Sequence, residues 1–288
     1  MNSLQRLGYP PDTKLLMLHA DDAGLCHAEN QATMRALQQG VLNSYSIMPA
    51  CPWFEEMARF ARDNSQYDYG IHLTLTCEWQ HYKWGPLLGA SGAPSLVRSD
   101  GYFFSNKTDF SNNARPDQVR NELRAQIERV LRFGLQPSHL DAHMFVLGQK
   151  PEFLAVYKAL GAEYGLPVLL HETIVDLSTA GPEQYFSDSD FRVDRLLLGN
   201  YPVFAEGRLF EFYHSTLDTL QAGLNVLIVH PAFDDAEMQG VAVEHPNFGS
   251  AWRQIDFDFC TDPRTAATLA KQGIQLIDWR EIRRRLCI

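Results

Sequence analysis

The sequence has few cysteines, and their placement argues against two common kinds of site. Five cysteines are scattered through the 288 residues, and none of them form a CxxC pair. An odd, dispersed set of this kind disfavours both a disulfide framework and a zinc site built from thiolates. We expect reduced and mostly buried thiols, which are typical of a cytoplasmic protein.

Long apolar runs and a basic charge balance are also missing. No apolar run approaches the roughly 20 residues that span a bilayer, and the first residues contain no signal-peptide core. The formal net charge of −10 argues against a general nucleic-acid binder, which needs a basic face. The GxGxxG, P-loop, GxSxG and HExxH motifs are absent as well. We therefore predict a cytoplasmic protein that binds neither nucleic acid nor membrane.

What the sequence does contain is an alternation of short apolar segments with longer helical patterns. The expected strands are 14–20, 44–48, 69–75, 137–141, 167–171, 193–198, 225–230 and 274–277, and the expected helices are 27–39, 52–62, 116–131, 151–164, 208–222, 262–272 and 279–286. Because parallel strands need crossover connections, this order predicts an α/β protein. We expect one domain over residues 1–288, a (β/α) TIM-like barrel that is irregular or incomplete. An open, doubly wound sheet is the alternative.

One segment interrupts the alternation. The excursion at about 77–114 carries aromatic residues that include Trp79, Tyr82, Trp84, Tyr102, Phe103 and Phe104. A loop of this length in a compact domain is usually either functional or disordered. The aromatic content favours an ordered cover over the mouth of the barrel.

Histidines and aspartates gather at the carboxyl ends of the predicted strands. They are His19, Asp21 and Asp22 on the first strand, His72 on the third, His139, Asp141 and His143 around the fourth, and His230 on a late strand. The active sites of parallel α/β barrels lie at this edge. Taken alone, Asp21 and Asp22 can cap the next helix, and His72 can be a hydrogen-bonded core residue. The 139–143 cluster can equally be a polar strand end, and His230 a surface turn.

One aspartate and two histidines from such a set would form a facial N/O ligand set with open coordination positions. Two imidazoles favour a transition metal such as zinc over Mg²⁺, which prefers carboxylate-rich sites. A metal there would lower the pKa of a bound water and polarise a substrate carbonyl. Asp21 would then take the proton, and a protonated His230 on the opposite side would protonate the leaving amine.

Four segments together resemble the YdjC-like carbohydrate (chitooligosaccharide) deacetylase family. They are His-Ala-Asp-Asp-Ala-Gly at 19–24, Gly-Ile-His-Leu-Thr-Leu at 70–75, Pro-Ser-His-Leu-Asp-Ala-His at 137–143 and His-Pro at 230–231. The resemblance implies a (β/α) barrel, one divalent ion per chain (Mg²⁺, Zn²⁺ or another transition metal) and a homodimer. It also implies hydrolytic removal of N-acetyl groups from an amino sugar or a short oligosaccharide.

The same resemblance assigns roles by position. Asp22, His72 and His143 correspond to the metal ligands. Asp21 corresponds to the general base and His230 to the catalytic acid. The residues expected to support the ligands or to contact substrate are His139, Asp141 and His19.

The sequence also departs from the family pattern. His19 and Ala23 stand where the family usually has Asn and Phe, and Phe145 and Leu147 stand where it often has further histidines. These changes leave the metal set intact and bear on the surface that faces the substrate.

Two alternative functions stay open. One is an amidohydrolase or phosphoesterase acting on another small molecule; a phosphoesterase would need basic residues near the mouth, and the motifs contain none. The other is a non-catalytic binding protein that keeps the metal.

Overall fold

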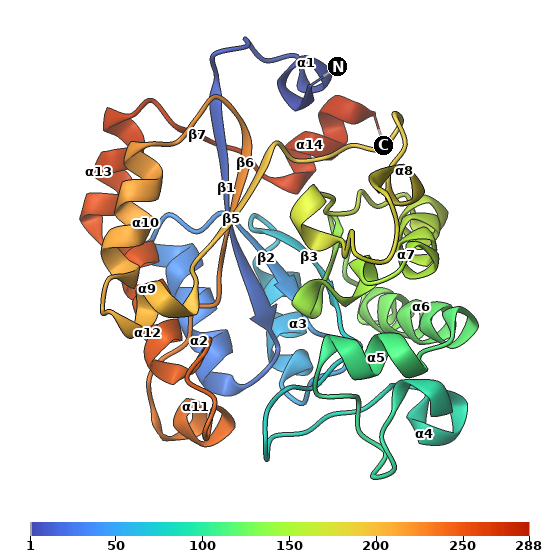
Figure 1. Ribbon diagram of the computed structural model, residues 1–288. Helices are drawn as coiled ribbons and strands as arrows, with labels where there is room; N and C mark the ends of the chain where they lie inside the picture. Colours follow the sequence, from blue (N-terminus) through green and yellow to red (C-terminus); the bar gives the residue numbers. More distant parts are fainter. Residues whose placement is uncertain (1, 288) are drawn as a thin grey trace.

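A single curled sheet of parallel strands forms the centre of the computed structural model, which describes residues 2–287 (Figure 1). The strands within that range are β1 (Lys14–Ala23), β2 (Ser44–Ile47), β3 (Asp68–Leu73), β4 (Leu140–Ala142), β5 (Arg195–Leu198), β6 (Gly223–Val229) and β7 (Gln275–Leu276). Their order is β4-β3-β2-β1-β6-β5, and the short β7 pairs with the start of β1. Helices surround the sheet on its outer side (Figure 1). The predicted α/β barrel-like fold is therefore confirmed.

The helices follow the predicted pattern closely and add several short ones. They are α1 (Ser3–Leu7), α2 (His27–Gln39), α3 (Phe54–Asp63), α4 (Gly89–Gly92), α5 (Lys107–Asn113), α6 (Pro116–Arg132), α7 (Pro151–Tyr164), α8 (Pro182–Tyr185), α9 (Tyr201–Ala205), α10 (Leu209–Asp218), α11 (Ala236–Val241), α12 (Ser250–Thr261), α13 (Pro263–Lys271) and α14 (Trp279–Leu286). Three 3₁₀ turns are η1 (Pro94–Leu96), η2 (His143–Gly148) and η3 (Glu172–Ile174). Helix α12 is not predicted from the sequence, and it turns out to contribute to the site.

The barrel is closed only irregularly between β4 and β5. The segment 167–171 is predicted as a strand, but it forms just one isolated bridge, between Leu140 and Val168. Its backbone still joins both neighbours: Leu169 N–H donates to Leu140 O (3.0 Å), and Val193 N–H donates to Leu170 O (3.0 Å). Pro167 has no N–H to donate, which limits the ladder on this side. The result is an incomplete barrel and not an open, doubly wound sheet.

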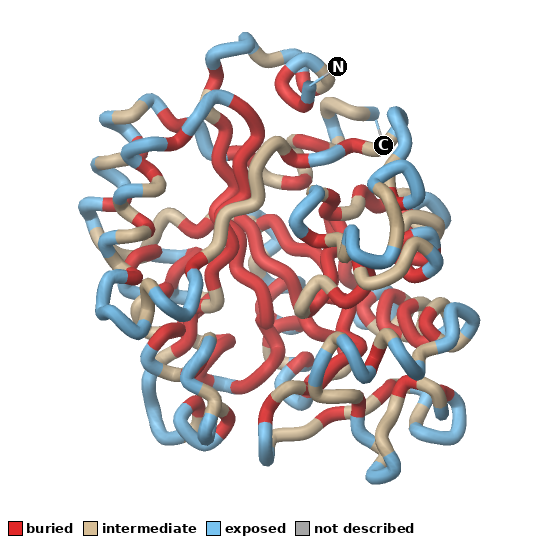
Figure 2. Tube along the Cα trace, viewed as in Figure 1, coloured by how far each residue is buried: buried red, intermediate tan, exposed pale blue. Residues whose placement is uncertain are grey.

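The inner row of β1 changes from apolar to polar along the strand. Successive strand residues point to opposite faces. Leu15 and Met17 belong to an apolar cluster inside the barrel, which α1 and α14 cover at the amino end of the strands. His19 and Asp21 continue the same row and are also buried, as Figure 2 shows for the strands as a whole. The barrel interior is therefore apolar at its amino end and polar at its carboxyl end.

Gly70 on β3 makes room for a histidine in this interior. An added Cβ at Gly70 would lie 2.4 Å from the Cε1 and Nε2 atoms of the His139 ring. We therefore expect Gly70→Ala to lower the free energy of unfolding by about 1–3 kcal/mol, the usual effect of overpacking a core. Denaturant unfolding measures the change. Gly240→Ala is the control, because an added Cβ there meets nothing within 4 Å. Equal stability of the two variants would contradict the packing argument.

The long excursion after β3 is an ordered cover that includes α4, η1 and α5. Its base is held by backbone and side-chain hydrogen bonds, among them Cys77 N–H to Phe104 O (2.8 Å) and Trp84 Nε1–H to Thr76 O (3.1 Å). Tyr82 Oη–H reaches across to Leu25 O (2.7 Å), which follows β1. These contacts fix the first part of the excursion against the carboxyl ends of the strands. The whole excursion, residues 77–114, is hereafter called the cover.

Candidate metal and catalytic site

The end of β1 directs two adjacent carboxylates into the barrel mouth. Neighbouring strand residues normally face opposite sides of a sheet. Here the pairing with β2 is interrupted between Ala20 and Ala23, and Asp22 has a left-handed backbone with φ of 66°. Aspartate is among the few residues that adopt this conformation readily. Both Asp21 and Asp22 consequently line one cavity.

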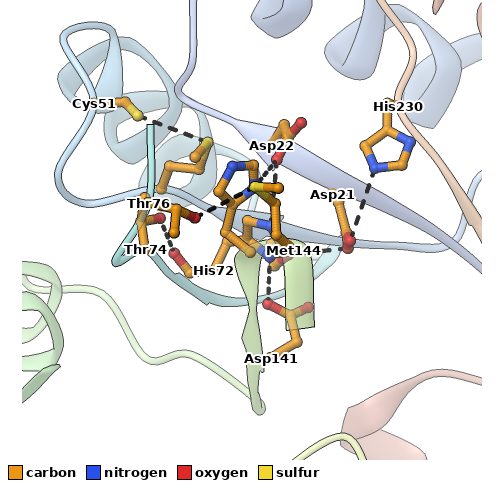
Figure 3. Close-up of polar contacts among 12 residues, drawn as sticks. Asp21, Asp22, Cys51, His72, Thr74, Thr76, Asp141, Met144 and His230 are labelled. Carbon is orange, nitrogen blue, oxygen red and sulfur yellow. Dashed lines mark hydrogen bonds and ion pairs between the residues drawn. The ribbon is translucent and has the colours of Figure 1, made fainter. Parts of the chain in front are cut away.

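Asp22, His72 and His143 meet, although they come from β1, β3 and the start of η2. Their ligand atoms all lie within 4.8 Å of one another. Asp22 Oδ1 lies 3.3 Å from His72 Nε2 and 3.1 Å from His143 Nδ1. All three side chains are buried, and Figure 3 shows Asp22 beside His72. One carboxylate oxygen and two ring nitrogens that face one another are a donor set that suits a divalent cation.

The second oxygen of Asp22 is held by an arginine from α12. Arg253 Nη2 donates to Asp22 Oδ2 (2.7 Å), and Arg253 Nη1 donates to Glu29 Oε2 (2.8 Å) on α2. Burial by itself would raise the pKa of Asp22, but the Arg253 guanidinium and the histidines hold this pKa well below its usual range. Burial raises the pKa of Glu29, and the Arg253 guanidinium opposes that rise. The ion pairs therefore leave Asp22 Oδ1 free to face the two histidines.

Removing this arginine is expected to destabilise the protein strongly. Arg253→Met leaves Asp22 and Glu29 as buried carboxylates without their cation, and breaking such a pair typically costs about 3–5 kcal/mol. The double variant Arg253→Met/Glu29→Gln should recover part of the loss because one of the two buried charges is gone. Denaturant unfolding of both variants measures this. An Arg253→Met protein as stable as wild type would show that the ion pairs of Arg253 with Asp22 and Glu29 contribute nothing to the stability of the fold.

Asp141 connects three histidines beneath the metal-ligand cluster. Its Oδ1 lies 2.7 Å from His72 Nδ1, and its Oδ2 lies 2.9 Å from His19 Nε2 and 3.4 Å from His139 Nε2. The His139 ring in turn stacks on Trp279 with centroids 4.9 Å apart. His19, His139 and Asp141 do not line the cavity. Their placement fits support of the ligands and not contact with substrate.

Asp21 and His230 face each other across the mouth. His230 directly follows β6, and its Nε2 lies 4.0 Å from Asp21 Oδ2 (Figure 3). Its backbone N–H donates to Asp256 Oδ2 (2.7 Å) on α12, which fixes the turn at the strand end. Burial lowers the pKa of His230 to about 4. This lowered pKa favours a neutral imidazole at rest near neutral pH, and the role of His230 as the catalytic acid stays a prediction.

A cavity of about 550 Å³ lies above these residues. Its floor contains Asp21, Asp22, His143 and His230. The rest of the lining is half apolar (Trp79, Met144, Phe145, Leu196, Leu198 and Phe248) and half polar or charged (Glu78, Lys107, Thr173, His245, Asn247 and Arg253). A hollow of about 640 Å³ near α1 is slightly larger, but it lies at the amino end of the strands and contains none of the predicted site residues. We therefore take the cavity above the cluster as the candidate site.

The two departures from the family pattern in the third motif, Phe145 and Leu147, lie in different surroundings. Phe145 lines the cavity wall, whereas Leu147 is buried in the hydrophobic core. Met144 and Phe145 both have φ of 54°, so the backbone at the start of η2 turns sharply next to His143. Residues held in this sparsely populated region often cluster at functional sites.

Comparison with known proteins shows which family the chain resembles. The sequence profile of the family described as YdjC-like protein matches residues 15–271. The chain belongs to the YdjC-like protein family. Two similar relatives are named carbohydrate deacetylase. The one from Geobacillus stearothermophilus is 30% identical and covers 92% of this chain and 96% of its own. The one from Thermus thermophilus is 30% identical and covers 99% of this chain and 100% of its own.

A solved structure confirms the fold of this YdjC-like chain. A protein from Enterococcus faecalis V583, described as a cellobiose-phosphate cleavage protein, superposes with a TM-score of 0.76 at 27% identity. The superposition covers 94% of this chain and 99% of the other. Within residues 2–287, none of the helices is both long and apolar enough to cross a membrane.

Sequence reasoning missed four residues of the site: Glu78, Arg253, Glu29 and Lys107. Glu78 lies in the cover, where its Oε2 is 2.9 Å from His143 Nε2. Lys107 begins α5 and supplies a cation to the cavity, although the sequence motifs contain no basic residue. Glu29, Arg253 and Lys107 lie in helices and Glu78 lies in the long excursion, all outside the His and Asp motifs, so those motifs did not indicate their role.

Proposed function

We propose that this YdjC-like protein is a metal-dependent carbohydrate deacetylase that hydrolyses the N-acetyl amide of an amino sugar or a short oligosaccharide. The observation that carries the proposal is the meeting of five side chains: Asp21, Asp22, His143 and His230 line the floor of one cavity, and His72 contacts Asp22 next to it. The names of the relatives support the same reaction class, and they match nearly the full length of the chain.

Asp22 Oδ1, His72 Nε2 and His143 Nδ1 would hold the divalent cation. Two imidazoles favour zinc or another transition metal, and Mg²⁺ stays an alternative. A cation bound there lowers the pKa of water and polarises a carbonyl oxygen. Three buried donors from separate elements keep their relative positions because β1, β3 and η2 belong to one packed core.

Asp21 and His230 are proposed to move the proton. Asp21 lines the cavity next to the ligand cluster, where its carboxylate accepts a proton from the attacking water. His230 is neutral at rest, so it must gain a proton before it can act as an acid. The 4.0 Å between Asp21 Oδ2 and His230 Nε2 is short enough for that proton to pass after a small side-chain movement. His230 then protonates the nitrogen of the breaking amide, and acetate and a free amine result.

The cavity suits a small sugar better than a polymer surface. Its volume of about 550 Å³ falls within the range of about 300–1,000 Å³ that is usual for small-molecule pockets. Trp79, Phe145 and Phe248 present ring surface in its lining, and flat apolar rings can pack against the apolar face of a sugar. Asp21, Glu78 and Asn247 offer acceptors or donors for its hydroxyl groups.

Acetate release from a panel of N-acetylated sugars tests the proposal. We expect release that stops when the protein is treated with a chelator and returns when one divalent metal is added back. Phosphate release from sugar phosphates in the same panel would support the phosphoesterase alternative. Sugar binding without turnover in the metal-loaded protein would support the non-catalytic alternative. No acetate from any sugar with any metal would overturn the proposal.

A cytoplasmic location and a homodimer are part of the same proposal. The five cysteines are all free, and four of them are buried, which fits a reducing compartment. The homodimer rests on the family resemblance, and sedimentation velocity at micromolar concentration tests it against the 32.7 kDa of one chain.

A further inference from the structure

The two candidate ligand histidines are held in the same way by different parts of the chain. His72 has Nε2 toward Asp22 Oδ1 (3.3 Å) and Nδ1 against Asp141 Oδ1 (2.7 Å). His143 has Nδ1 toward Asp22 Oδ1 (3.1 Å) and Nε2 against Glu78 Oε2 (2.9 Å). Each ring therefore has one nitrogen in the cluster and the other on a separate carboxylate.

This arrangement decides which nitrogen can bind a cation. A neutral imidazole carries its proton on one nitrogen and a lone pair on the other. A carboxylate that accepts the N–H fixes both the tautomer and the ring orientation, and it makes the opposite nitrogen a better ligand. For His143, a proton on Nε2 that is donated to Glu78 leaves the Nδ1 lone pair directed at the cluster. Asp141 has the corresponding effect on His72.

Glu78 reaches His143 from the cover, whereas Asp141 belongs to the sheet. Glu78 follows Cys77, whose backbone N–H is bonded to Phe104 O (2.8 Å), so the backbone beside Glu78 is fixed. The Glu78 side chain is only 11% exposed, which protects its contact with His143 from water. The ring of Trp84, also in the cover, lies edge-on to His143 with centroids 6.3 Å apart. The cover thus contacts the His143 ring at two points.

We infer that Glu78 is a positioning residue for His143, so that the cover, and not only the barrel, sets the affinity of the site for its divalent ion. The inference rests on the proposed metal site and adds to it a residue outside the ligand set. It also gives the cover a chemical role beyond enclosing the substrate. A cover that moved away from the mouth would remove Glu78 from His143 and weaken the site.

The test is the dissociation constant for Zn²⁺ alone, measured by competition with a chromophoric chelator and without substrate. Glu78→Ala removes the acceptor, and we expect its Kd to rise about 10–100-fold, the usual effect of losing such a partner. Glu78→Gln keeps a carbonyl oxygen that can still accept the N–H, so its Kd should lie between those of Ala and wild type. Two controls should keep the wild-type Kd. Glu244→Gln makes the same change at an exposed carboxylate, and Asn247→Ala alters the same cavity away from His143.

The visible absorption of the Co²⁺-substituted protein distinguishes a positioning residue from a ligand. As a positioning residue, Glu78 can be replaced without changing the Co²⁺ spectrum at saturating metal. An altered spectrum in Glu78→Ala would make Glu78 a direct ligand and overturn the inference. An unchanged Zn²⁺ Kd in both variants would overturn it as well. A wild-type protein that binds no divalent metal would instead defeat the proposed function itself, so the two failures are distinguishable.

Discussion

Asp22→Asn and His143→Ala are expected to remove the metal ion that we predict the wild-type protein to carry at about one per chain. Each change takes one of three protein donors from the site, and structural or catalytic sites of this kind depend on three or four donors. Asn at position 22 keeps a hydrogen-bond acceptor for Arg253 but loses the carboxylate charge. Elemental analysis of the desalted proteins measures the loss.

His245→Ala is the matched control for this experiment. His245 lines the same cavity and packs against Trp79, but it does not belong to the ligand cluster. Its replacement should leave the metal content unchanged. Undiminished metal in both Asp22→Asn and His143→Ala would refute the ligand assignment, provided that circular dichroism shows both variants to be folded.

Asp21→Asn is expected to keep the metal and to lose most of the turnover. An amide cannot accept the proton from water, and general acid–base groups typically contribute about 10²–10⁴-fold to the rate. Asp21 lies outside the Asp22–His72–His143 group, although it forms another close group with His72 and Asp141. Metal content and kcat must therefore be measured on the same preparation.

The two possible roles of Asp21, metal ligand and general base, predict different results for Asp21→Asn. Loss of the metal together with activity would make Asp21 a ligand. Wild-type turnover would exclude it as the base. Asp258→Asn on the exposed face of α12 makes the same chemical change away from the site and should alter neither quantity.

The regular parts of the fold were predictable from local pattern. The helix 151–164 has the predicted bounds, because Pro151 begins it and Gly165 ends it in a left-handed conformation. The segment 167–171 failed as a strand, since it forms one isolated bridge to Leu140 of β4 and only a few backbone hydrogen bonds to its neighbours. That failure depends on how the barrel closes, which no local pattern contains.

The site was predictable only where it belongs to the strands. Asp22 and His72 could be found because the carboxyl ends of parallel strands meet at one edge. Arg253 could not, because α12 reads as a mixture of aromatic and charged residues, and a buried arginine looks the same in sequence as an exposed one. Glu78 could not be found either, because it lies in the cover and contacts His143 from 65 positions away along the chain.

The apolar cluster at the amino end of the barrel has a consequence for how substrate enters and products leave. Because α1 and α14 cover that end over Leu15 and Met17, the candidate cavity lies at the opposite, carboxyl end of the strands, beside the cover. If the chain is the proposed deacetylase, both products leave by the opening through which the substrate entered. Acetate, formed at the floor of the cavity beside Asp21, then leaves either after the sugar or past it.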